Sequence, residues 1–165
     1  MKQPQYVDLP NMVTTAPLGR LGLAMEFRAH LAAKDRFCDQ LEAIADRLPD
    51  AVDLRDCLIV AQKIIPMINR AHQFEEGFVF PLILAENAAV IELPEWLERL
   101  KFEHLGDEEF ASDLSSALRD FATNKEDANI QSLSWMLRGF FEGLRRHVAF
   151  ERSSLLPLLE NHRSP

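Results

Sequence analysis

Two segments of the sequence place a histidine one turn before a carboxylate inside an otherwise apolar stretch. Their potentially reactive residues are His72, Glu75, Glu76, His147 and Glu151. Burying a carboxylate costs several kcal/mol unless a positive group meets it. Imidazole nitrogens and carboxylate oxygens are common ligands of first-row transition metals. We therefore predict that the positive partner is a pair of metal ions bridged by the carboxylates.

Two further histidines, His30 and His104, lie on the apolar faces of two other helical segments, so that each of four segments carries one. A lone histidine on such a face is more often a hydrogen-bonded core residue. Counted at the helical rise per residue, however, the four histidines lie roughly 15–21 Å from the same end of an antiparallel bundle. All four rings can therefore meet in one layer, which favours a shared site.

The segment that contains His72 leaves two registers open. In the segment 147–157, HVAFERSSLLP, the histidine and the glutamate precede the final proline by ten and six residues. The same count back from the proline of AHQFEEGFVFP gives Ala71 and Glu75. We favour this register, in which one ion lacks a histidine, because Glu75 also fits the apolar spacing of the helix. In the alternative register, His72 pairs with Glu76.

The mixed nitrogen and oxygen donors suit iron or manganese, with zinc as a less favoured alternative. We expect two metal ions at this site. Glu26 lies one turn before His30 and either fills the missing position or accepts a hydrogen bond from outside the site. The predicted metal ligands are His30, His72, Glu75, His104, His147 and Glu151, with Glu76 and Glu26 as further candidates.

Four amphipathic segments must position these residues, and their apolar spacing is helical throughout. Asp53 is a good N-cap for the second segment, Pro94 suits the first turn of the third, and Pro66 is expected to kink or break the second. Short connections make neighbouring helices antiparallel, which predicts an all-α, up-down-up-down four-helix bundle. The four helices are expected at 18–48, 53–86, 94–122 and 128–161.

The composition excludes several classes of function. The chain has 165 residues, of which 47% are hydrophobic and 27% charged, and this suits one globular domain. Its net charge of −8 argues against nucleic-acid binding. No apolar run is long enough to cross a membrane. The two cysteines, Cys38 and Cys57, are expected to be buried thiols in a reducing compartment, which indicates a cytoplasmic protein.

Residues 1–17 contain three prolines and no helical period, so we expect an extended N-terminal arm before a bundle domain at 18–161. His162 follows the last helix and is expected to be solvated. A homodimer or a protein partner is expected to use the arm or exposed aromatic residues. The aromatic residues expected in the core or on a dimer face are Trp96, Trp135, Phe140 and Phe141.

The order of these motifs resembles the hemerythrin-like, HHE cation-binding family over residues 18–160. The family pattern has a lone histidine on helix 1, a His-x-x-x-Glu segment running to a proline on helix 2, Glu-His on helix 3 and a second His-x-x-x-Glu segment on helix 4. The chain contains in that order EFRAH, AHQFEEGFVFP, FEHL and HVAFERSSLLP. Family members often have two adjacent histidines on helix 2, where this chain keeps only His72 after Ala71.

The resemblance implies a non-haem di-iron protein, in which oxo or carboxylate bridges join the two iron ions and manganese or zinc is less favoured. Such a protein is expected to bind or sense oxygen, peroxide or nitric oxide rather than act as a dedicated enzyme. One alternative is a metal-free or single-metal interaction bundle with a partly lost site. Another is a ferritin-like iron oxidase, which builds its site from Glu-x-x-His. This last class is disfavoured, because the residues three before the four histidines are Phe27, Asn69, Lys101 and Leu144.

Overall fold

The computed structural model describes residues 19–124 and 128–160, and within these ranges every regular element is helical. The expected arm and His162 lie outside the described residues. The elements are α1 (Arg20–Arg47), α2 (Leu54–Phe74), the π-helical turn η1 (Glu75–Val79), α3 (Phe80–Glu86), α4 (Leu93–Thr123), α5 (Ile130–Phe150), the π-helical turn η2 (Glu151–Leu155) and α6 (Leu156–Glu160).

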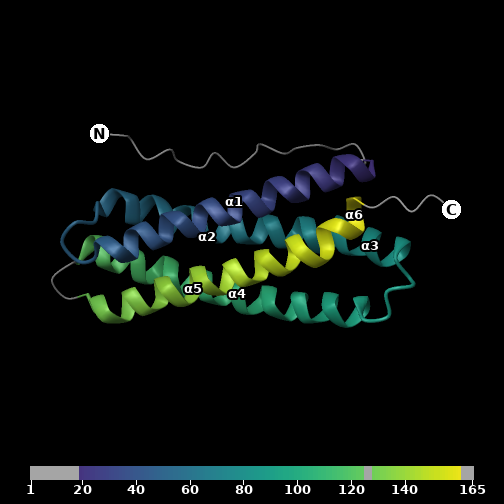
Figure 1. Cartoon of the computed structure of the whole chain (residues 1–165). Coiled ribbons are helices and arrows are strands. Elements are labelled where there is room, and N and C mark those ends of the chain that lie inside the picture. Colours follow the sequence, from purple (N-terminus) through teal and green to yellow (C-terminus); the bar gives the residue numbers. More distant parts are fainter. Residues whose placement is uncertain (1–18, 125–127, 161–165) are drawn as a thin grey trace.

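These elements form four long rods, because η1 joins α2 to α3 and η2 joins α5 to α6. Consecutive rods run in opposite directions along the bundle (Figure 1). The most extensive contacts join α2 to α4 and α1 to α5. At one end of the bundle, Arg20 of α1 pairs with Glu86 and donates to the carbonyl oxygen of Leu159 in α6. The predicted all-α four-helix bundle is confirmed.

Local sequence signals account for where the helices begin. The Asp53 side chain accepts a hydrogen bond from the backbone N–H of Arg55 at 2.8 Å, and Asn129 accepts from Ser132 at 2.9 Å. Each satisfies one backbone donor that the first helical turn leaves open. Pro94 lies in the first turn of α4, as expected. Pro66, in contrast, lies inside α2, which continues through it to Phe74.

The interruption of the second rod comes later, at a π-helical turn, and the fourth rod repeats it. The backbone N–H of Phe80 bonds to the carbonyl of Glu75, and that of Leu156 bonds to the carbonyl of Glu151. Each bond spans five residues instead of the four of an α-helix. Pro81 follows Phe80 and Pro157 follows Leu156, and neither proline has a backbone N–H to continue the helical hydrogen bonds. The two carboxylate-bearing segments therefore share one backbone geometry.

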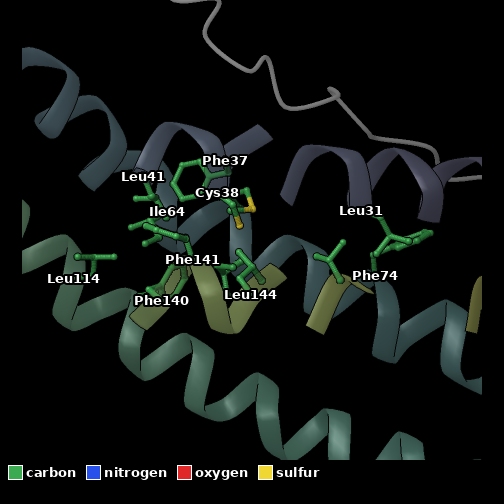
Figure 2. Packing of buried hydrophobic residues seen from close by; sticks show 14 of the residues in the cluster. Leu31, Phe37, Cys38, Leu41, Ile64, Phe74, Leu114, Phe140, Phe141 and Leu144 are labelled. Atoms are coloured by element: carbon green, nitrogen blue, oxygen red, sulfur yellow. The ribbon is translucent and has the colours of Figure 1, made fainter. Parts of the chain in front are cut away.

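The four rods enclose one apolar core. Figure 2 shows Phe37 and Leu41 of α1 close to Phe140 and Phe141 of α5. Cys38 and Cys57 are buried and unpaired, and burial raises the pKa of Cys38 to about 12 and that of Cys57 to about 11. No helix within the described part of the chain is long and apolar enough to span a membrane.

The aromatic residues expected in the core or on a dimer face separate into two groups. Phe140 and Phe141 are buried, and Trp96 packs partly buried with its ring edge against Phe150. Trp135 is 72% exposed and lies on the outer face of α5. Phe102, on α4, is also largely exposed.

Two phenylalanines provide a matched test of this core. Phe141 is 2% exposed and Phe102 is 77% exposed. We expect Phe141→Ala to lower the free energy of unfolding by about 3–5 kcal/mol, because it leaves a cavity among packed side chains. Phe102→Ala should change it by no more than about 0.5 kcal/mol. Urea denaturation of the two variants measures both values, and similar losses would contradict the packing described here.

Candidate metal centre

Four buried side chains direct ligand atoms toward one point between the rods. Glu75 begins η1, Glu151 begins η2, His104 lies on α4 and His147 lies on α5. One ligand atom from each lies within 4.8 Å of one from every other. Since the two glutamates are fully buried, their charges depend on the groups around them. This cluster could hold a metal ion.

A lysine, which the sequence reasoning missed, lies against both carboxylates. The Lys34 ammonium donates to Glu75 Oε1 at 2.6 Å and to Glu151 Oε2 at 2.9 Å, and all three side chains are fully buried. Burial by itself lowers the pKa of Lys34, but the two carboxylates outweigh it and the pKa is raised. For Glu151, burial by itself raises the pKa, but the neighbouring Lys34 and His147 outweigh it and the pKa is lowered. Both shifts favour the charged forms, the Lys34 ammonium and the Glu151 carboxylate.

The positive charge that meets the two buried carboxylates comes from a lysine of the chain itself. The sequence reasoning assigned their positive partner to a pair of metal ions, whereas the structure provides Lys34. The position carried a signal: Lys34 lies one turn after His30 and one turn before Phe37, on the inner face of α1. A lysine at a position that the helical period assigns to the core needs a buried partner.

The second oxygen of each carboxylate turns toward a histidine. Glu75 Oε2 lies 3.3 Å from His104 Nε2, and Glu151 Oε1 lies 3.5 Å from His147 Nε2. All four atoms are buried, and none has a hydrogen-bond partner. Such unsatisfied groups are rare in protein interiors and mark a place where an ion or a water belongs. The donors, two imidazoles and two carboxylates, fit a first-row transition metal.

Three carboxylates outside the cluster lie near the other ring nitrogen, Nδ1, of three of the histidines. Glu76 Oε1 lies 2.6 Å from His104 Nδ1, Glu108 Oε1 lies 3.0 Å from His72 Nδ1, and Glu103 Oε2 lies 3.3 Å from His147 Nδ1. With Nδ1 protonated, the His104 and His72 rings can donate to Glu76 and Glu108 and present an unprotonated Nε2 to the interior. Glu103 lies within ion-pair distance of His147, but His147 Nδ1 makes no hydrogen bond to it. Carboxylates arranged in this way around metal-binding histidines orient the rings and raise their basicity.

The structure distinguishes the two registers of the η1 segment. Glu75 is the residue among the converging donors, whereas the Glu76 side chain is 40% exposed and contacts His104 from the outside. Ala71 is buried one turn before Glu75, and its carbonyl accepts from the Glu75 backbone N–H. Glu75 therefore occupies the inward position that the count from the proline favoured.

His72 lies beside the four donors rather than among them. Its ring stacks on that of His104, with the ring centroids 3.8 Å apart and the planes 8° from parallel. Its Nε2 is buried without a hydrogen-bond partner. Burial is the main cause that lowers the pKa of His72 to about 2, followed by the neighbouring His104. The ring is therefore neutral, as a metal ligand must be.

His30 is placed apart from the four donors. Its ring lies 4.6 Å from that of Phe74, and its Nε2 is 3.9 Å from Glu26 Oε1. Burial lowers the pKa of His30 to about 4, with Lys34 as the next cause, and Nδ1 has no hydrogen-bond partner. Of the eight candidates from the sequence, the structure thus brings four together and places His72, Glu76, His30 and Glu26 around them.

Comparison with known proteins agrees with the motif order and with the bundle. Searches of curated proteins and of solved structures returned no significant match. The family model described as the hemerythrin HHE cation-binding domain matches residues 23–159, which include all four converging donors and Lys34. The chain therefore belongs to the hemerythrin HHE cation-binding domain family.

Proposed function

We propose that the chain binds iron at Glu75, His104, His147 and Glu151, and that it binds or senses oxygen, peroxide or nitric oxide there. One observation carries the proposal: an imidazole nitrogen or carboxylate oxygen of each residue is buried, faces the others and lacks a hydrogen-bond partner. Manganese and zinc are the alternatives, because imidazole ligands also suit zinc and carboxylate ligands also suit manganese. His72 is the neighbouring residue best placed to join them.

A cavity of about 360 Å³ between α4 and α5 supports entry of a small molecule. Glu103, Asp107 and His147 line it together with Arg99 and Arg146. It therefore reaches the Nδ1 side of a proposed ligand. A bound iron ion would supply an open coordination position and an exchangeable electron to a small molecule. The protein's own contribution is to hold the His104 and His72 rings, through Glu76 and Glu108, and to keep the site largely dry.

A metal-free interaction bundle is the second candidate, and Lys34 favours it. The ammonium already gives Glu75 and Glu151 a counter-charge, so the buried carboxylates do not by themselves require a metal. Such a bundle would act through a protein partner or a second copy of the chain. Exposed aromatic residues such as Trp135 and Phe102, or residues 1–17, would supply the contact. Metal analysis separates this function from the first.

The two cysteines support a cytoplasmic setting for the proposed function. Both are buried and unpaired, as thiols in a reducing compartment are. Their raised pKa keeps them protonated at neutral pH, so neither is a candidate metal ligand or nucleophile.

Metal analysis tests the proposal directly. After anaerobic loading with Fe(II) and removal of free metal, we expect the purified protein to retain at least one ion per chain. The sequence predicts two ions, whereas the position of Lys34 favours one. Because His104 and His147 each supply an inward nitrogen, His104→Ala and His147→Ala should abolish retention, and His162→Ala should leave it unchanged. A wild-type protein without metal would refute iron binding and leave the interaction bundle.

The η1 register gives a second prediction. Glu75→Gln removes an inward carboxylate, whereas Glu76→Gln removes a contact with the outer nitrogen of His104. We expect Glu76→Gln to weaken metal affinity by about 10–100-fold, and Glu75→Gln to weaken it more. Equilibrium dialysis against a competing chelator measures both. A larger loss in Glu76→Gln than in Glu75→Gln would show that His72 pairs with Glu76 instead.

A further inference from the structure

We propose that the Lys34 ammonium takes the place of a second metal ion, so that the centre holds a single ion per chain on its histidine side. The inference rests on the proposed metal binding and concerns how many ions the site can take. It departs from the two bridged ions that the sequence predicted.

The geometry of the two carboxylates carries the inference. A carboxylate that bridges two cations presents one oxygen to each. Glu75 presents Oε1 to Lys34 and Oε2 to His104, and Glu151 presents Oε2 to Lys34 and Oε1 to His147. Both glutamates therefore have the orientation of bridging ligands, with an ammonium at one of the two cation positions. The other position is lined by the oxygens and nitrogens that lack hydrogen-bond partners.

Charge and space both oppose a second metal ion beside Lys34. The ammonium lies within 2.6–2.9 Å of the oxygens that such an ion would need. All three side chains are fully buried, so the ammonium cannot turn into solvent without opening the helix packing around α1. A second divalent ion would leave excess positive charge in this interior, where Coulomb energies are poorly screened. One divalent ion on the histidine side comes closer to balancing the two carboxylates.

The placement of His30 fits the same account. His30 lies one turn before Lys34 on α1, is buried, and has an Nδ1 without a hydrogen-bond partner. It is also apart from the four converging donors. The charges of Lys34 and Glu151 both act on its ring, so His30 lies near the cation position that the ammonium occupies. Shortening Lys34 should therefore open a second site with Glu75, Glu151 and His30 around it.

The number of bound ions tests the inference. Metal-free wild-type protein and the variants Lys34→Ala and Lys101→Ala are titrated with Mn(II), and bound metal per chain is measured after removal of free ion. Lys101 is a control on the surface of α4, where it pairs with Glu98. We expect one ion in the wild type, one in Lys101→Ala and two in Lys34→Ala.

The alternative outcomes separate this inference from the proposed function. Two ions in the wild type would overturn the inference and leave metal binding intact. One ion in both the wild type and Lys34→Ala would also overturn it, because Lys34 would then not be what excludes the second ion. Failure of the wild type to retain either Mn(II) or Fe(II) would refute the proposed function itself, and the inference with it.

Two further measurements keep the inference testable if Lys34→Ala does not fold. The electron paramagnetic resonance spectrum of Mn(II)-loaded wild-type protein should show isolated ions, and a spin-coupled pair would overturn the inference. Lys34→Met removes the charge but fills the space. It should melt below the wild type when metal-free, because the two carboxylates lose their counter-charge, and should still bind no more than one ion. Binding of two ions by Lys34→Met would show that space does not limit the site.

Discussion

The interaction on which the centre of this bundle depends is the buried ion pair of Lys34 with Glu75 and Glu151. It joins α1 to the starts of η1 and η2, and so fixes three of the four rods at one height. The remaining rod, α4, contributes His104 through its contact with Glu75. Removing a partner from such a group leaves a buried charge unpaired, which is far more costly than losing a surface pair. Few changes at this height can therefore be neutral.

The bundle was predictable from the sequence because its signals are local and repeated. Apolar spacing identified all four rods, and Asp53 and Pro94 marked helix starts that the structure confirms. The π-helical turns at Glu75 and Glu151 were not predicted. A π turn differs from an α turn by one residue in its hydrogen bonding, which leaves the apolar spacing almost unchanged. The prolines that follow these turns were nevertheless a useful guide, since counting back from them selected Glu75.

The site was predictable in its residue types but less so in its arrangement. Equal height along the bundle brought His104 and His147 together with the two glutamates, as expected. Height does not determine how far a side chain reaches across the interior, so it could not separate these donors from His30. Lys34 was missed for a different reason. A search for metal ligands considers histidines and carboxylates, while a buried lysine reveals itself only as a charged residue at a core position of α1.

A counter-charge that belongs to the chain changes the relation between metal binding and folding. In a bundle whose only cations are metal ions, the carboxylates remain uncompensated until metal arrives, and binding and folding are coupled. Here the single ammonium of Lys34 offsets part of the negative charge of Glu75 and Glu151 from the outset, while the oxygens opposite it stay unpartnered. The ammonium thus holds each carboxylate with its second oxygen toward the histidines. The contact with Lys34 therefore lowers the cost of burying the two carboxylates in the metal-free fold. The same contact orients both glutamates for an ion on the histidine side.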